Sequence, residues 1–248
     1  MKYYVNFRKA KVILLASLLL LVGCAGASGT PTPPANEPDD GESPSDLIQF
    51  GSVRPGDTLA VMETSMGTIL VRLFPQYAPI TVENFVGLAE EGFFDGRNFH
   101  RVINDFMIQG GALNPDGAGG TSIFKDDAGN PQPFVDEFSE YLWHFRGALS
   151  MANPGMRDSN LSQFFIVQNN DVPEPLADQM RTAGFPEEVV EQYMRRGGTP
   201  HLDGGHTVFG QVIEGMAVVD AIAAVPTGAN DRPVDDVLIT SVTIQIAE

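Results

Sequence analysis

Hydrophobic and polar residues alternate in short runs along the chain from Gly56 onward. Residues 58–74 contain two β-rich runs, LAVMET and TILVRLF, on either side of Ser65-Met66-Gly67, which predicts a β-hairpin. Further strand-like runs follow with glycine-rich breaks between them: NFHRVI, FMIQGG, GALSMA, QFFIVQ and TVFGQVI. The chain closes with VLITSVTIQI, which alternates as a half-buried strand should.

Two segments have helical rather than strand periodicity. The first begins at Pro79 and ends before Gly92, a natural C-cap. Its apolar residues follow the i, i+3, i+4, i+7 spacing: Val82, Phe85, Val86 and Ala89. The second covers residues 214–225 and stops at Pro226. Many short strands with two isolated helices predict a mainly β fold, a closed antiparallel barrel with helices at its ends. The pattern alone leaves a β-sandwich open.

The first 56 residues have a different pattern. A basic stretch and an apolar run, residues 12–22, too short to span a bilayer, predict a signal peptide over residues 1–23. The ending LVGC resembles a bacterial lipobox, which implies cleavage before Cys24 and a diacylglycerol on its sulfur. The protein would then be extracytoplasmic, and this lipid would be its one link to the bacterial cell membrane. An ordinary signal peptide that contains a cysteine is the alternative. Residues 24–56 are rich in proline and acid, which predicts a disordered tether.

Charge and cysteine content exclude several functions. The chain has 32 acidic and 15 basic residues, and four of the basic ones lie within the first 23 positions. The exported chain would carry 11 basic against 32 acidic groups, a net charge of −21. Such a surface repels phosphate backbones, so we expect no nucleic acid partner. Cys24 is the sole cysteine, which excludes an intrachain disulfide and a thiolate metal cluster.

Five segments occur in an order that is specific when they are taken together: residues 98–103 (NFHRVI), 106–111 (FMIQGG), 149–153 (LSMAN), 162–166 (SQFFI) and 202–210 (LDGGHTVFG). From about residue 59 to 246 the chain resembles the cyclophilin family of peptidyl-prolyl cis-trans isomerases. That resemblance implies a closed eight-stranded antiparallel β-barrel capped by two helices, over residues 57–248. It also implies a monomeric enzyme that accelerates rotation of Xaa-Pro bonds, here in exported polypeptides, without a cofactor or metal.

The residue types suit this chemistry. An Xaa-Pro bond resists rotation because amide resonance imposes a barrier of roughly 18–20 kcal/mol. A fixed cation that donates hydrogen bonds to the twisted amide lowers this barrier without a nucleophile. By resemblance Arg101 is the catalytic residue. The resemblance also gives the substrate-binding residues, in chain order Phe106, Met107, Gln109, Ala152, Asn153, Gln163, Phe165, Leu202 and His206.

Some of these residue types also have structural interpretations. Neighbouring residues on a strand face opposite ways, so we expect Phe164 to lie in the core while Phe165 lines the pocket. By resemblance Gln109 and Gln163 orient Arg101 and the peptide carbonyl, although each could equally be a structural amide. A chain with the same pocket could also hold proline-containing segments without catalysing rotation. A metal site at His201, Asp203 and His206 is a weaker alternative, because three or four converging ligands are needed and no further histidine cluster exists.

The chain departs from the family pattern in three places. His201 stands where eukaryotic members often have tryptophan, and Pro154 stands where a small residue usually borders the pocket. Residues 171–200 are additional, and residues 186–196 within them predict a short helix with acid in its first turn and arginine in its last. This helix either packs on the barrel or forms a lip that selects protein clients.

The tryptophan that His201 replaces contributes to cyclosporin binding. We therefore expect weak inhibition by cyclosporin, with isomerase activity retained. A cyclosporin titration of the isomerisation rate checks this. An inhibition constant below about 50 nM, equivalent to about 10 kcal/mol of binding free energy, would contradict it.

Overall fold

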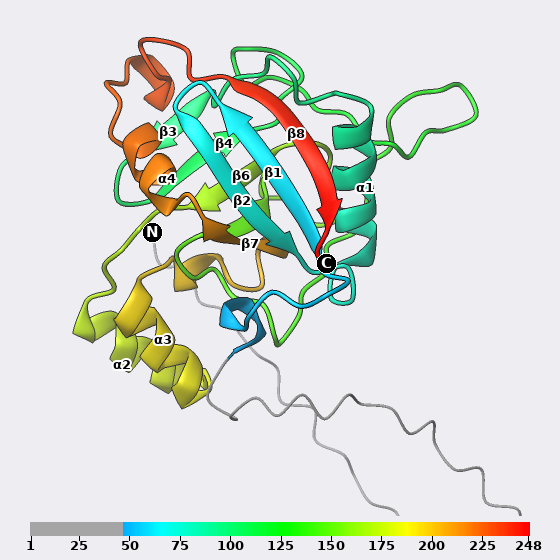
Figure 1. Ribbon diagram of the computed structural model, residues 1–248. Coiled ribbons are helices and arrows are strands. Elements are labelled where there is room, and N and C mark those ends of the chain that lie inside the picture. The colour runs from blue at the N-terminus through cyan, green and yellow to red at the C-terminus, as the bar shows by residue number, and fades with distance from the viewer. Residues whose placement is uncertain (1–46) are drawn as a thin grey trace, which may run out of the picture. The chain divides into compact units, whose positions relative to one another are not determined.

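The computed structural model describes residues 47–248, and the predicted signal peptide, Cys24 and the tether up to residue 46 lie outside this range (Figure 1). Eight strands form one antiparallel sheet in the order β3-β4-β6-β5-β7-β2-β1-β8. The strands are β1 (Thr58–Thr64), β2 (Gly67–Leu73), β3 (Arg101–Ile103), β4 (Met107–Gly110), β5 (Ala148–Met151), β6 (Phe164–Val167), β7 (Val208–Glu214) and β8 (Ile239–Ile246). The predicted hairpin is confirmed, because β1 pairs with β2 from Leu59↔Arg72 to Thr64↔Gly67.

The sheet curls but does not close as a barrel. The edge strands β3 and β8 share no strand ladder, and one isolated bridge, Asn98↔Leu238, joins the segments that precede them. Backbone hydrogen bonds Phe99 N→Val237 O (2.9 Å) and Ile239 N→Arg97 O (2.7 Å) flank this bridge. Because β3 has only three residues, the contact does not extend into a ladder. The expectation of a closed barrel is therefore corrected to a curled sheet that is open along this edge.

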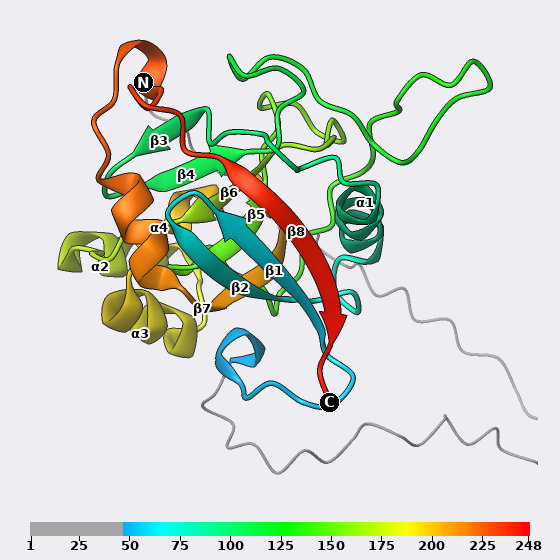
Figure 2. The same cartoon turned by 45° about the horizontal axis from the view of Figure 1, so that its top comes forward.

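Two helices lie against the sheet, as predicted. Helix α1 (Pro79–Glu90) packs beside β8, and helix α4 (Met216–Ala223) packs against β2, β3 and β4 (Figures 1 and 2). Proline in the first turn starts α1 where a missing N–H costs no hydrogen bond. The predicted apolar positions Val82, Phe85 and Ala89 are buried, whereas Val86 is half-buried.

Aromatic rings from several elements meet in the main core. The side chain of Phe164 on β6 is fully buried, and its ring centroid lies 5.8 Å from that of Phe85, 5.7 Å from Phe94 and 6.4 Å from Phe99. The prediction that Phe164 belongs to the core is confirmed. The strand therefore turns Phe165 to the opposite face of the sheet.

The folded part begins earlier than the sequence pattern indicated. A short 3₁₀ helix, Ile48–Phe50, lies within the predicted tether, and Gln49 in it is buried. Its side chain donates to the carbonyl of Trp143 (2.9 Å) and to Oε1 of Gln211 (3.0 Å). The half-buried side chains of Leu47, Ile48 and Phe50 also pack against buried clusters of the domain, so residues 47–50 belong to the folded part.

The additional segment forms two helices where one was predicted. Helix α3 (Glu187–Arg196) confirms the prediction over residues 186–196, and α2 (Glu174–Ala183) precedes it. The two helices share a small core with residues of the main domain: Phe145, Val172, Ala177, Met180, Val189, Val190 and Tyr193. The segment is therefore packed onto the sheet domain. No helix within residues 47–248 is long and apolar enough to cross a membrane.

Replacing Phe164 by alanine should lower the free energy of unfolding by about 3–5 kcal/mol, because a cavity would open among the three aromatic rings that surround it. Urea denaturation of wild type and variant measures the difference. A loss below about 1 kcal/mol, within the range of surface substitutions and tolerated core swaps, would contradict a core position for this ring.

Candidate functional site

A row of side chains crosses the sheet on the face opposite the aromatic core. The strand register pairs Arg101 with Gln109, Gln109 with Phe165, and Phe165 with Ser150. Residues that lie directly opposite in a ladder project from the same face. Arg101 and Phe165 therefore lie on one face, separated by one strand that carries Gln109.

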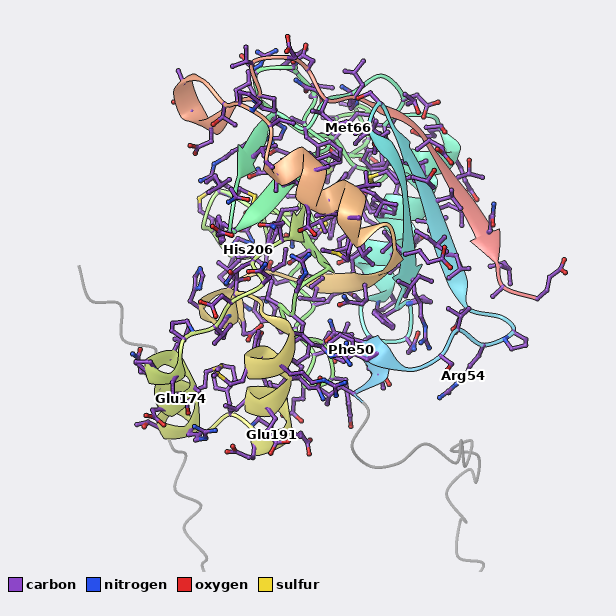
Figure 3. The ribbon with its side chains drawn as sticks, turned by 60° about the vertical axis from the view of Figure 1, so that its left-hand side comes forward. Phe50, Arg54, Met66, Glu174, Glu191 and His206 are labelled. Atoms are coloured by element: carbon purple, nitrogen blue, oxygen red, sulfur yellow. The ribbon has the colours of Figure 1, made fainter. Side chains whose placement is uncertain are left out.

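A cavity of about 270 Å³ opens over this row. It is lined by Arg101, Phe106, Met107, Gln109, Ala152, Asn153, Gly155, Phe165, Leu202 and His206. Every substrate-binding residue expected from the sequence is in this set except Gln163, and Gly155 is the one additional member. His206 lies between the sheet and the insertion helices α2 and α3 (Figure 3). Segments distant in the sequence thus converge on one cavity, which combines apolar walls with polar side chains and the cation of Arg101.

Arg101 is held at the cavity by an acidic partner. Its Nε lies 3.5 Å from Oδ2 of Asp231, and the two side chains are 42% and 49% exposed. Asp231 follows Asn230, and both have left-handed backbone conformations, with φ of 58° and 60°. Such strain in non-glycine residues is typical of functional sites. No sequence pattern indicated Asp231, because it lies 130 positions from Arg101 in an irregular segment.

Gln163 supports the site from behind the cavity lining. Its Oε1 accepts a hydrogen bond from Nε2 of Gln109 at 3.0 Å. Its own Nε2 donates to the carbonyls of Gly117 (3.1 Å) and Gly119 (2.8 Å). The amide of Gln109 is therefore oriented beside Arg101, with Gln163 as the link to the 117–119 loop.

The apolar lining is made by aromatic rings from three segments. A tight turn with Asp105 at φ 57° projects Phe106, whose ring stacks on His201 with centroids 5.9 Å apart. The ring of Phe165 meets that of His206 edge to face at 5.5 Å. These contacts form two walls of a slot that has the chemical character to accept a proline ring.

His206 contributes a neutral imidazole to the cavity. Burial lowers its pKa, and the nearby His144 lowers it further. Its Nδ1 lies 3.0 Å from the carbonyl oxygen of Met151, which can only accept, so Nδ1 carries the hydrogen. The Nε2 atom is then an acceptor, and the ring presents no charge to an apolar ligand.

The 152–155 segment forms the remaining rim. The backbone N–H of Ala152 donates to the carbonyl of Gln163 (2.9 Å), and the side chain of Asn153 donates to the carbonyl of Gly205 (3.4 Å). Pro154, expected to border the pocket, is exposed and does not line the cavity. Gly155 takes that place.

The residues of the alternative metal site do not converge. His206 binds the Met151 carbonyl, whereas Asp203 accepts hydrogen bonds from His144 and from Tyr193 on α3. Within residues 47–248, no group of three or more His, Cys, Asp or Glu side chains is arranged to hold a metal ion.

The family model described as cyclophilin type peptidyl-prolyl cis-trans isomerase matches residues 59–244, three quarters of the chain. The chain therefore belongs to the cyclophilin family, and it is a peptidyl-prolyl cis-trans isomerase.

Relatives in other organisms agree with this assignment. A Staphylococcus epidermidis protein and a Staphylococcus haemolyticus protein, each named "Putative peptidyl-prolyl cis-trans isomerase", are 47% identical over 193 residues, which is 78% of this chain and 94% of theirs. A crystal structure of a Cryptosporidium parvum cyclophilin type isomerase superposes with a TM-score of 0.61 at 26% identity, covering 77% of this chain and 99% of that one. A second structure of that protein, determined in the presence of the dipeptide Ala-Pro, gives a TM-score of 0.60.

Acid should destabilise the fold through its buried histidines. Burial is the largest cause that lowers the pKa of His100, His201 and His206. A histidine whose folded pKa lies below its unfolded value of about 6.5 binds more protons when unfolded, so its contribution is present above that pH and is lost as the pH falls through the folded pKa. We expect the melting temperature to fall between about pH 7 and pH 5, above the range in which carboxylates titrate.

The variant His206→Asn isolates one of these groups. Its melting temperature should fall less than that of the wild type over the same pH interval. Identical losses in both proteins would show that His206 does not bind its proton more weakly in the folded state.

Proposed function

We propose that Arg101 stabilises the twisted Xaa-Pro amide while the proline ring occupies the slot between Phe106 and Phe165. Rotation breaks no covalent bond, so the barrier falls when an interaction is stronger in the twisted state than in either planar state. As the amide twists, its nitrogen regains a lone pair and its carbonyl loses resonance. A guanidinium beside them donates hydrogen bonds whose strength grows along this coordinate.

The observation that carries this proposal is the placement of Arg101 in the lining of a cavity that also has the apolar walls of Phe106 and Phe165. The guanidinium is half-exposed, so it can reach a bound peptide, and Asp231 keeps it near the cavity. The amide of Gln109, fixed by Gln163, lies beside it on the neighbouring strand. Arg101, Gln109 and Phe165 therefore lie side by side on adjacent strands. A proline ring in the slot beside Phe165 would place its peptide bond toward Gln109 and Arg101.

We further propose that the clients are exported polypeptides and that the enzyme acts as a monomer outside the cytoplasm. The lipobox-like LVGC at residues 21–24 supports a lipid anchor on Cys24 in a bacterial cell membrane. Residues 25–46, which lie between this cysteine and the described residues, are rich in proline and acid, as suits a tether. The excess of acidic residues disfavours nucleic acid and anionic lipid surfaces as partners.

The variant Arg101→Ala should slow turnover of a proline-limited protein substrate by about 100-fold or more, because the variant loses the donor to the twisted amide. A proline-limited refolding assay measures this rate. Circular dichroism should show that the fold is intact.

The matched control is Arg232→Ala. Arg232 has nearly the same exposure, 39%, and also pairs with an aspartate, Asp236 at 3.0 Å. This substitution removes the same charge but should leave the rate within about twofold, as expected for an exposed ion pair. Equal rates for wild type and Arg101→Ala would reject Arg101 as the catalytic group and leave a peptide-holding role.

A further inference from the structure

A buried polar cluster lies directly behind the apolar wall of the cavity. His144 contacts Oδ1 of Asp203 through Nδ1 (2.7 Å) and the hydroxyl of Ser150 through Nε2 (2.9 Å). The Ser150 hydroxyl donates to the carbonyl of Thr207 (3.0 Å), and the hydroxyl of Tyr193 donates to Oδ2 of Asp203 (2.6 Å). The cluster thus joins β5, the segment around Asp203 and helix α3.

The hydrogen positions in this cluster are determined by its acceptors. Ser150 has one hydroxyl hydrogen and gives it to a carbonyl, so its oxygen must accept from Nε2 of His144. Nδ1 faces a carboxylate that already accepts from Tyr193 and from the backbone N–H of His144 (2.9 Å). Both ring nitrogens of His144 therefore have a polar partner within the cluster.

The arrangement of Ser150, His144 and Asp203 resembles that of a serine hydrolase but cannot act as one. Ser150 and His144 are 0% and 1% exposed, so no substrate reaches the hydroxyl. His144 also presents the N–H of Nε2 to this hydroxyl, so Nε2 does not accept the serine proton. The cluster therefore has a structural consequence, which depends on what it touches.

The cluster touches three residues of the cavity. The ring of His144 stacks on that of Phe165, with centroids 5.9 Å apart and planes 12° apart. It also meets His206 edge to face at 6.4 Å. Asp203 directly follows Leu202, which lines the cavity from a short 3₁₀ helix, Pro200–Leu202. One hydrogen-bonded unit thus supports the slot from behind.

Tyr193 connects this unit to the additional helices. Its ring is fully buried and packs on Phe145 with centroids 4.5 Å apart. Burial, followed by the charge of Asp203, raises the pKa of its hydroxyl well above the ordinary value. The hydroxyl therefore remains a donor across the physiological range. No residue of α2 or α3 lines the cavity. The insertion reaches the site instead through the hydrogen bond from the Tyr193 hydroxyl to Asp203, which belongs to the cluster behind the cavity wall.

We infer that Tyr193 is a positioning residue for proline binding: acting through Asp203 and His144, its hydroxyl fixes Phe165 and Leu202 at the spacing that a proline ring requires. The insertion of residues 171–200 is then part of the isomerase site, and it affects short peptides as well as proteins. This inference rests on the proposed function of the cavity, and it adds a role for the insertion other than a lip over the groove.

The test is Tyr193→Phe, which removes one oxygen and leaves the ring in place. We expect KM for an Ala-Pro tetrapeptide to rise about fivefold with kcat within about twofold, as loss of one hydrogen bond to a charged group would allow. Tyr141→Phe is the matched control, because Tyr141 is 57% exposed, and it should leave both constants unchanged.

A second control separates positioning from simple stability. Val172 is buried in the same small core as Tyr193, and Val172→Ala should lower the melting temperature without raising KM. A rise in KM confined to Tyr193→Phe supports the inference. Unchanged KM in Tyr193→Phe, or an equal rise in both variants, overturns it.

A measurement on the wild type covers the case in which Tyr193→Phe does not fold. In protein labelled with ¹⁵N-histidine, the Nε2–H group of His144 should be visible by NMR, and its signal should shift when an Ala-Pro peptide fills the cavity. Absence of this signal, or no shift at saturation, overturns the inference. The same titration gives the peptide affinity. A wild type that binds the peptide but does not speed its isomerisation would reject the proposed catalysis, and the shift of the His144 signal would still decide the positioning role.

Discussion

The site depends on the antiparallel register of four strands, β3, β4, β6 and β5. This register aligns Arg101, Gln109, Phe165 and Ser150 in one row on one face of the sheet. A slip of one residue on β6 would exchange Phe165 with Phe164 and turn a core ring toward the cavity. The aromatic core around Phe164 prevents this slip, so the packing that stabilises the fold also fixes the spacing between the cation and the apolar wall.

Rotation about an amide bond breaks no covalent bond, so its catalysis depends on where the hydrogen-bond donors are placed. The gain comes from donors that are already oriented when the bond twists, and mobile side chains would lose that advantage. Arg101 has Asp231 on one side and the Gln109–Gln163 pair on the other. Phe165 is backed by His144, whose polar atoms all have partners. A fully satisfied buried network has one low-energy arrangement, which makes the wall behind the proline rigid.

The sequence was sufficient for the elements and for most of the cavity. Periodicity located the hairpin, both sheet-packing helices and α3, and the motif resemblance supplied the cavity residues apart from Gly155. Neither periodicity nor the motif resemblance could predict features that depend on contacts between distant segments. Asp231 reaches Arg101 from an irregular segment, and Asp203 was considered only as a metal ligand. Helix α2 was missed because a short, polar-rich run that contains proline resembles a loop. The 3₁₀ helix at Ile48–Phe50 was missed because three residues are too few to show a helical period. Strand pattern also does not determine whether edge strands pair, so barrel closure was overestimated.

The most direct test of this account is exchange NMR of an Ala-Pro peptide in the presence of the wild-type domain, with protein amide shifts recorded in the same sample. The account predicts cis/trans exchange cross-peaks that are absent without protein, together with amide shifts centred on Arg101, Gln109 and Phe165. Peptide binding that shifts a different face of the sheet, or that shifts this row without producing exchange, would contradict it.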